Sequence, residues 1–189
     1  MFDRAETKTD GWFKQFWLQL PAAATVDGNR ATMRTAGGQQ LVTTTLLPAG
    51  ATATVQQYGE DIGRQADGDP MTHRLRVDAP GNPRSTRFLH VLQGADGNAT
   101  PDTPALVESV DGAQFVGAAV ADTMVLFPDK AQPNLPGTTI TVPNGVKRML
   151  VTGLTPDTGY TASRDGDRIT ISAGGSAAAD HGGVLVTTI

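Results

Sequence analysis

Residues Arg87 to Gly97 read RFLHVLQGADG, a mostly apolar run that has a histidine at its centre and ends at glycine and aspartate. Successive side chains of an extended strand point to opposite faces of the sheet. The run therefore divides into two sets, Phe88, His90 and Leu92 on one face and Leu89 and Val91 on the other. Because a strand that is apolar on both faces belongs inside a sheet, we predict a central strand here, with His90 at or near the core.

His90 has two interpretations. A catalytic histidine needs a cleft and a partner group that shares its proton, and the residues around His90 in the sequence suggest neither. A buried neutral imidazole that donates a hydrogen bond to a nearby carbonyl needs only the strand itself. We adopt the second interpretation, in which this stretch is scaffold and not active site.

The composition extends the strand pattern to the whole chain. Its 189 residues include 22 glycines and 12 prolines, and threonine and valine recur in short clusters between turn residues, as in proteins built from short strands. The expected strands are residues 30–35, 40–47, 51–58, 72–78, 85–93, 105–110, 113–120, 123–127, 138–142, 147–152, 160–164, 168–173 and 183–189. The predicted fold class is all-β, an antiparallel β-sandwich of about a dozen short strands. We expect one domain over residues 1–189, with a candidate sub-boundary near residues 128–137.

Turn chemistry and periodicity refine this outline. Gly37-Gly38, Asp111-Gly112 and Asp165-Gly166 favour tight hairpins. Residues 94–104, 128–136 and 174–182 are loop-like. Residues 12–20, WFKQFWLQL, fit a helical stripe as well as a strand, so periodicity leaves this element undecided.

Several kinds of chemistry find no support in the sequence. The chain has no cysteine and a net charge of −4, which offers neither thiol chemistry nor a global field for nucleic acid. No apolar run approaches the ~20 residues that span a bilayer. The 3 histidines lack metal-ligand spacing, and the loop Gly94–Asp102 lacks the glycine and glutamate of an EF-hand. We therefore expect no metal, no cofactor and no catalytic residue, and neither nucleic acid nor a membrane as partner.

A few residues are candidates for binding a glycan. Arg74 and Arg76 are two positions apart, so on a strand they share a face and can fork onto carboxylates or sulfates. The aromatic rings of Trp12, Trp17, Tyr58 and Tyr160 can stack on sugars, although the core competes for them. A solvated sheet face is the alternative for the arginines. The glycan-binding candidates are Arg74, Arg76, His73, Trp12 and Tyr58.

Segments taken in series resemble a known family. MFDRAETKTDGWFKQFWLQLP (residues 1–21), VDGN (26–29), QLVTTTLLPAGATATV (40–55) and RFLHVLQ (87–93) occur in the order found in the C-terminal β-sandwich of the heparinase II/III-like polysaccharide lyases. The matching segments run over about the first half of the chain. In that family a helical toroid precedes stacked antiparallel sheets. The resemblance implies that residues 12–20 form a strand.

The resemblance also implies an exported bacterial parent that acts on uronate-containing polysaccharide, and hence a secreted or periplasmic location with the export signal outside this chain. It carries over no catalytic residue, because the family's catalytic groups lie ahead of the segment that matches residue 1 onward. A separate local likeness covers residues 150–163, LVTGLTPDTGYTAS, which resemble the strand corner of fibronectin type III modules. Tyr160 would there hydrogen-bond back over the turn.

Three functions follow as hypotheses. The first is a non-catalytic β-sandwich module of a polysaccharide-lyase-like protein, which supports a helical catalytic domain or holds an acidic polysaccharide. The second is a stand-alone carbohydrate-binding or adhesion module. The third is an autonomous polysaccharide lyase, which requires a cleft where His73 or His181 meets a carboxylate. The first leads because the family segments come without a catalytic set.

Overall fold

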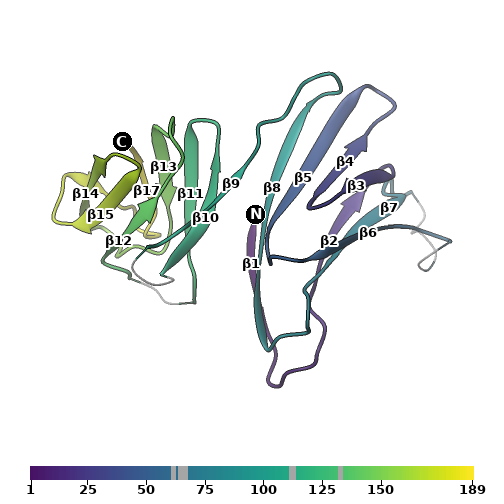
Figure 1. The fold of residues 1–189 in the computed structure, drawn as a ribbon, viewed down its shortest axis with the longest axis horizontal. Coiled ribbons are helices and arrows are strands. Elements are labelled where there is room, and N and C mark those ends of the chain that lie inside the picture. The colour runs from purple at the N-terminus through teal and green to yellow at the C-terminus, as the bar shows by residue number, and fades with distance from the viewer. Residues whose placement is uncertain (61–62, 64–67, 111–113, 132–133) are drawn as a thin grey trace. The chain divides into compact units, whose positions relative to one another are not determined.

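The computed structural model describes residues 1–60, 63, 68–110, 114–131 and 134–189, and strands dominate the fold (Figure 1). These residues form strands β1 to β17 and no helix, which confirms the all-β fold class. The chain divides into two compact units, Met1–Pro101 and Asp102–Ile189, each with its own sheets and core. We call them unit 1 and unit 2 and describe each by itself.

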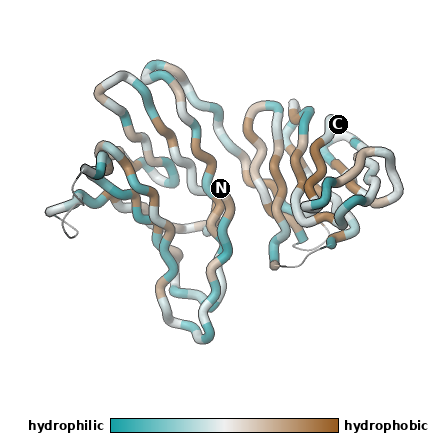
Figure 2. The backbone as a smooth tube through the Cα atoms, turned by 180° about the vertical axis from the view of Figure 1, so that it is seen from behind, coloured by the Kyte–Doolittle hydropathy of each residue, from teal (hydrophilic) through white to brown (hydrophobic). Residues whose placement is uncertain are grey.

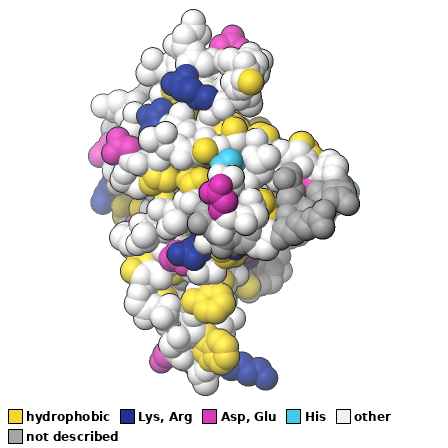
Figure 3. Space-filling model, turned by 90° about the vertical axis from the view of Figure 1, so that its right-hand side faces the viewer, with side chains coloured by type: hydrophobic (Ala, Val, Ile, Leu, Met, Phe, Trp, Pro, Cys, Tyr) yellow, Lys and Arg dark blue, Asp and Glu magenta, His cyan; other side chains and the backbone are white. Residues whose placement is uncertain are grey.

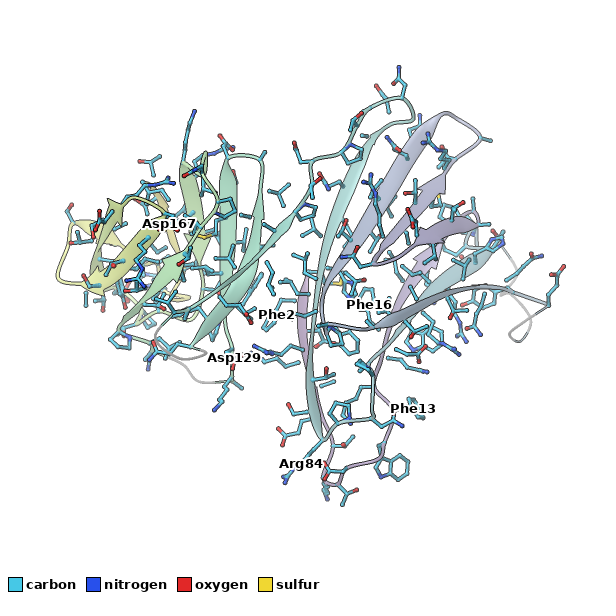
Figure 4. The ribbon with its side chains drawn as sticks, in the orientation of Figure 1. Phe2, Phe13, Phe16, Arg84, Asp129 and Asp167 are labelled. Carbon is cyan, nitrogen blue, oxygen red and sulfur yellow. The ribbon has the colours of Figure 1, made fainter. Side chains whose placement is uncertain are left out.

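Unit 1 is a sandwich of two antiparallel sheets. Its strands are β1 (Phe2–Glu6), β2 (Gln15–Leu20), β3 (Ala24–Asp27), β4 (Arg30–Arg34), β5 (Gln39–Leu47), β6 (Thr52–Gln57), β7 (His73–Asp78) and β8 (Ser85–Asp96). One sheet has the order β1-β8-β5-β4-β3 and the other the order β2-β7-β6. The core between them takes Phe16, Leu20, Leu75 and Val77 from the smaller sheet and Ala31, Met33 and Phe88 from the larger. Phe16 points between the sheets in Figure 4.

The stretch that suggested the fold forms most of β8, which pairs with β1 on one side and β5 on the other. Phe88, Leu89 and His90 are each 1% exposed, so consecutive side chains on opposite faces are buried and the prediction of a central strand is confirmed. The strand runs beyond its expected end because the ladder with β5 continues to the pair Gln39 and Asp96.

His90 is a core residue, but its hydrogen bond differs from the expected one. Its ring stacks on Phe16 with 3.9 Å between centroids, and its Nδ1 lies 3.0 Å from the Thr45 hydroxyl oxygen, not from a carbonyl. The Nε2 atom has no hydrogen-bond partner among the described residues. Burial, and secondarily the positive amino terminus of Met1, lower the pKa of His90 to about 4. The imidazole is therefore neutral at pH 7, as the scaffold interpretation requires.

Unit 2 has a larger core between two further sheets. Its strands are β9 (Ala105–Glu108), β10 (Phe115–Val120), β11 (Thr123–Pro128), β12 (Gly137–Thr141), β13 (Arg148–Val151), β14 (Gly159–Asp165), β15 (Arg168–Ala173), β16 (Ala177–Ala178) and β17 (Leu185–Thr188). The sheet orders are β17-β13-β11-β10-β9 and β12-β15-β14-β16. Figure 2 shows the apolar stretches that run along these strands. The predicted turn at Asp111-Gly112 lies outside the described residues.

One ladder departs from the otherwise antiparallel pattern of the sheets. β11 and β13 run parallel, with Met124 opposite Met149, whereas the other ladders between named strands of the described chain are antiparallel. A parallel pair needs a crossover connection, and here the chain passes through β12 in the other sheet before it returns to β13.

The proline-rich segment near residues 128–137 is part of that crossover. It joins β11 to β12 within unit 2, whereas the sequence boundary between the two units falls between Pro101 and Asp102. Leu135, from within this segment, is buried in the same core as Leu126 and Ile140. The prolines therefore mark a passage between two sheets that share one core, and the division into units falls elsewhere.

The corner predicted around Tyr160 is present in unit 2. The Tyr160 hydroxyl accepts a hydrogen bond from the backbone N–H of Thr155 at 2.9 Å and donates one to the backbone carbonyl of Leu135 at 3.2 Å. The side chain is fully buried. One hydroxyl thus bonds to backbone groups of two separate segments, next to the bridge between Leu135 and Leu154.

Candidate functional site

The candidate site is the outer face of the β2-β7-β6 sheet in unit 1. Because alternate residues of these strands supply the core, the residues between them point outward. The outward set, which we call the arginine face, consists of Gln15, Trp17 and Gln19 from β2, Arg74, Arg76 and Asp78 from β7, and Thr52, Thr54 and Gln56 from β6. The ladder places them in rows across the sheet, with Gln19, Arg74 and Gln56 in one row and Trp17, Arg76 and Thr54 in the next.

Arg74 is held in place by two neutral groups. Its guanidinium carbon lies 3.8 Å from the centre of the Trp17 ring, and its Nε donates to the side-chain oxygen of Gln56 at 3.1 Å. No carboxylate of the described residues lies within ion-pair distance of it. The indole and the amide fix the plane of the guanidinium without neutralising its charge.

Arg76 differs from its neighbour because its charge is compensated. Its Nε contacts Asp78 at 2.8 Å, and the same carboxylate accepts a hydrogen bond from the Gln15 amide at 2.5 Å. Arg74 and Arg76 thus share a face, as their spacing predicted, but they offer different electrostatics. Arg74 provides the uncompensated positive charge, and the Arg76–Asp78 pair provides a neutral polar surface beside it.

Tyr58 joins the arginine face at the end of β6. Its hydroxyl donates to the side-chain oxygen of Gln19 at 2.9 Å, and its backbone N–H continues the ladder by bonding to the carbonyl of Thr72. Gln19 lies directly opposite Arg74 in the sheet. The structure therefore brings Tyr58, Arg74 and Arg76 together on one surface.

His73 and Trp12 are placed elsewhere. His73 is one residue from Arg74 on β7, so alternation directs it to the opposite side of the sheet, and its Nδ1 lies 2.8 Å from the Thr72 hydroxyl. Trp12 precedes β2 in the connection from β1 and is 62% exposed, as is its neighbour Phe13 at 65%. Phe13 marks this end of unit 1 in Figure 4.

Trp17 is one of the four aromatic residues that the sequence suggests for stacking on sugars, but it was not among the glycan-binding candidates. Trp17 is 36% exposed and contacts Arg74. A signal was available in the alternation of β2, because Phe16, Leu18 and Leu20 form the apolar set and leave Trp17 on the polar one. The helical alternative for residues 12–20 hid that alternation.

The electrostatics of the surface are local. Basic and acidic side chains are interspersed over the face seen in Figure 3, without one large patch of either sign. An anion on this face would therefore meet individual charged groups and not a broad field. Within the described part of the chain, no three His, Asp or Glu side chains are grouped to hold a metal ion, and no helix there is long and apolar enough to cross a membrane.

Among the described residues, one histidine forms a contact with a carboxylate of the kind that an autonomous lyase would need. His181 Nδ1 lies 2.6 Å from the Asp157 carboxylate oxygen. The two side chains are 94% and 61% exposed, however, so they stand in solvent and not in a cleft. Proton transfer to a bound substrate needs a positioned pair that excludes water, and this pair is not enclosed.

The comparisons with known proteins add no relative to this geometry. Neither a scan against protein-family models nor a search of curated proteins finds a match to this chain. The resemblance to the heparinase II/III-like polysaccharide lyases stays a prediction.

Proposed function

We propose that this chain is a non-catalytic β-sandwich module that holds an acidic polysaccharide on the arginine face. The observation that carries the proposal is the state of Arg74, which is oriented by Trp17 and Gln56 and has no acidic partner among the described residues. The Nε atom is already occupied, and the Nη atoms remain for a bidentate contact with a carboxylate or sulfate.

The surroundings of Arg74 suit a sugar polymer. The site is the face of a sheet and not an enclosed pocket, which suits a chain that continues past the site in both directions. The side-chain amides of Gln19 and Gln56 and the Tyr58 hydroxyl supply donors and acceptors for sugar hydroxyl groups within the same rows. The exposed edge of Trp17 adds apolar area for the carbon skeleton of a ring.

The wider context is part of the same proposal. The resemblance of the sequence segments to the heparinase II/III-like lyases supports a position beside a helical catalytic domain of an exported polysaccharide lyase, where the module would support that domain and retain its substrate. A module that only supports the catalytic domain needs no affinity for glycan at the arginine face. In that case the isolated chain would bind no acidic polysaccharide.

The test is a titration of the chain with oligosaccharides of alginate, heparin and hyaluronan, with a neutral glucan as control. We expect at least one acidic oligosaccharide to bind, and Arg74→Gln to weaken that binding about tenfold, the loss typical of one charged hydrogen-bonded contact. Arg84→Gln is the matched control, since it removes the same charge from an exposed site that is paired with Glu6 outside the arginine face. Equal effects of the two substitutions, or no binding of any acidic oligosaccharide, would reduce the module to a scaffold.

A further inference from the structure

A second polar site lies on the larger sheet of unit 1. An open concavity of about 450 Å³ is lined by Ala23, Thr25, Asp27, Arg30, Thr32 and Arg34, and we call it the β3–β4 groove. These residues alternate along the two strands with Ala31 and Met33, which belong to the core. The groove is therefore on the outer side of the β1-β8-β5-β4-β3 sheet, whereas the arginine face is on the β2-β7-β6 sheet. Binding in the groove does not require the arginine face.

One end of the groove is rigidly built. The Arg34 guanidinium donates to the backbone carbonyl of Gly97, and the N–H of Gly97 donates to the carbonyl of Gly38 at 2.6 Å. A Cβ atom at Gly97 would lie 2.7 Å from that Gly38 oxygen and 3.3 Å from Nη1 of Arg34. Glycine at position 97 thus lets the loop close on the guanidinium, which fixes a cation at this end.

The other end holds two charged groups that do not neutralise each other. Asp27 and Arg30 face each other directly across the β3–β4 ladder. Even so, neither makes an ion pair or side-chain hydrogen bond with any described residue. Between the two ends, Thr25 and Thr32 form the next cross-strand pair on the same face and add two hydroxyl groups.

This mixture of groups selects a class of ligand. A guanidinium binds a carboxylate, whereas a carboxylate such as Asp27 accepts hydrogen bonds from hydroxyl groups. Inorganic phosphate would use the arginines, but it carries more negative charge than one carboxylate and would be repelled more strongly by Asp27. A neutral sugar would leave Arg30 without a counter-ion. We propose that the β3–β4 groove binds a hexuronate, a single sugar ring with one carboxylate, which places its carboxylate on Arg30 and its hydroxyl groups on Asp27, Thr25 and Thr32.

The test follows backbone amide shifts of the full chain by NMR during titration with sodium glucuronate, glucose and inorganic phosphate. We expect glucuronate to shift resonances of residues 23–34 and to bind about tenfold more weakly to Arg30→Gln. Thr32→Val is a second variant that keeps the shape and the charge of the groove, and we expect it to weaken glucuronate by a few fold. Thermal unfolding of each variant confirms that unit 1 is intact.

The outcomes separate this site from the arginine face. Arg74→Gln should leave glucuronate binding in the groove unchanged, so the hexuronate site can stand even if the arginine face binds nothing. Phosphate or glucose that binds as tightly as glucuronate would overturn the hexuronate assignment. No shifts at residues 23–34 with glucuronate, in a folded chain, would overturn the site itself.

Discussion

The guanidinium of Arg74 packs on the ring of Trp17, with 3.8 Å between the guanidinium carbon and the ring centre. Both side chains belong to the outer face of one small sheet, and they come from neighbouring strands, β7 and β2. The contact orients a charge that no acidic residue of the described chain neutralises. The effect of this contact on binding can be measured separately from the effect of removing the charge of Arg74.

Replacing Trp17 tests whether orientation contributes to binding. Trp17→Leu keeps the net charge and most of the apolar surface but removes the cation–π contact, which is worth roughly 0.5–1 kcal/mol at an exposed site. We therefore expect acidic oligosaccharides to bind a few fold more weakly, with the loss measured by calorimetry. Trp12→Leu is the matched control, because Trp12 is exposed outside the arginine face. If both substitutions have the same effect, the Arg74–Trp17 contact has no special part in binding.

The buried imidazole of His90 makes stability depend on pH. Burial lowers the pKa of His90 from 6.5 to about 4. The unfolded chain then binds more protons than the folded chain between these two pKa values, so the free energy of unfolding falls as pH decreases through this window. On account of His90, the free energy of unfolding is about 3 kcal/mol higher above pH 6.5 than below about pH 4.

Urea unfolding at several pH values measures this effect. The two tryptophans, Trp12 and Trp17, both lie in unit 1, so their fluorescence reports the unit that contains His90. His90→Leu should flatten the pH dependence of the free energy of unfolding between pH 4 and 6.5. Parallel curves for the native chain and His90→Leu would show that His90 does not carry the effect.

The Tyr160 hydroxyl is predicted to stabilise unit 2. Tyr160→Phe would leave the Thr155 N–H and the Leu135 carbonyl without their partner, at a cost of about 1–3 kcal/mol. Circular dichroism during urea unfolding gives the change. Tyr58→Phe removes an exposed hydroxyl with one side-chain partner and should change stability by less than about 0.5 kcal/mol. Equal costs for the two substitutions would contradict the structural role of the corner.

Gly117 is predicted to be required for the pairing of β10 with β11. A Cβ atom at this position would lie 1.8 Å from the backbone oxygen of Val125, a clash that only a backbone shift can relieve. We expect Gly117→Ala to destabilise unit 2 by about 1–3 kcal/mol or more. Gly94→Ala is the matched control, also within a strand, where a Cβ would meet nothing within 4 Å. Hydrogen exchange of β10 amides would reveal the difference, and unchanged protection in Gly117→Ala would contradict the close approach.

The strands that sequence reasoning found and missed differ in a physical way. β1, β3 and β16 were not expected, and each lies at the edge of its sheet. Their residues are half-buried or exposed throughout, and the strands have only 5, 4 and 2 residues, so any apolar alternation in them is too short to mark a strand in the sequence. β8 was found because consecutive side chains on both of its faces are buried.

The candidate site could also be predicted only in part from the sequence. The spacing of Arg74 and Arg76 predicted their common face, since alternation on a strand requires it. It did not predict that Asp78 neutralises Arg76 alone, or that Trp17 reaches Arg74, because those contacts depend on the register between β2 and β7. The groups of the β3–β4 groove are likewise joined only by the register of two strands.

The most direct test of the account is a map of backbone and side-chain resonances of the full chain with an acidic oligosaccharide bound. We predict that the indole N–H of Trp17, the Nε–H of Arg74 and the side-chain amide of Gln56 shift together, and that in Arg74→Gln the shifts at Trp17 and Gln56 need about tenfold more oligosaccharide. Binding that leaves these three resonances unmoved, or shifts of the same size with a neutral glucan, would contradict it.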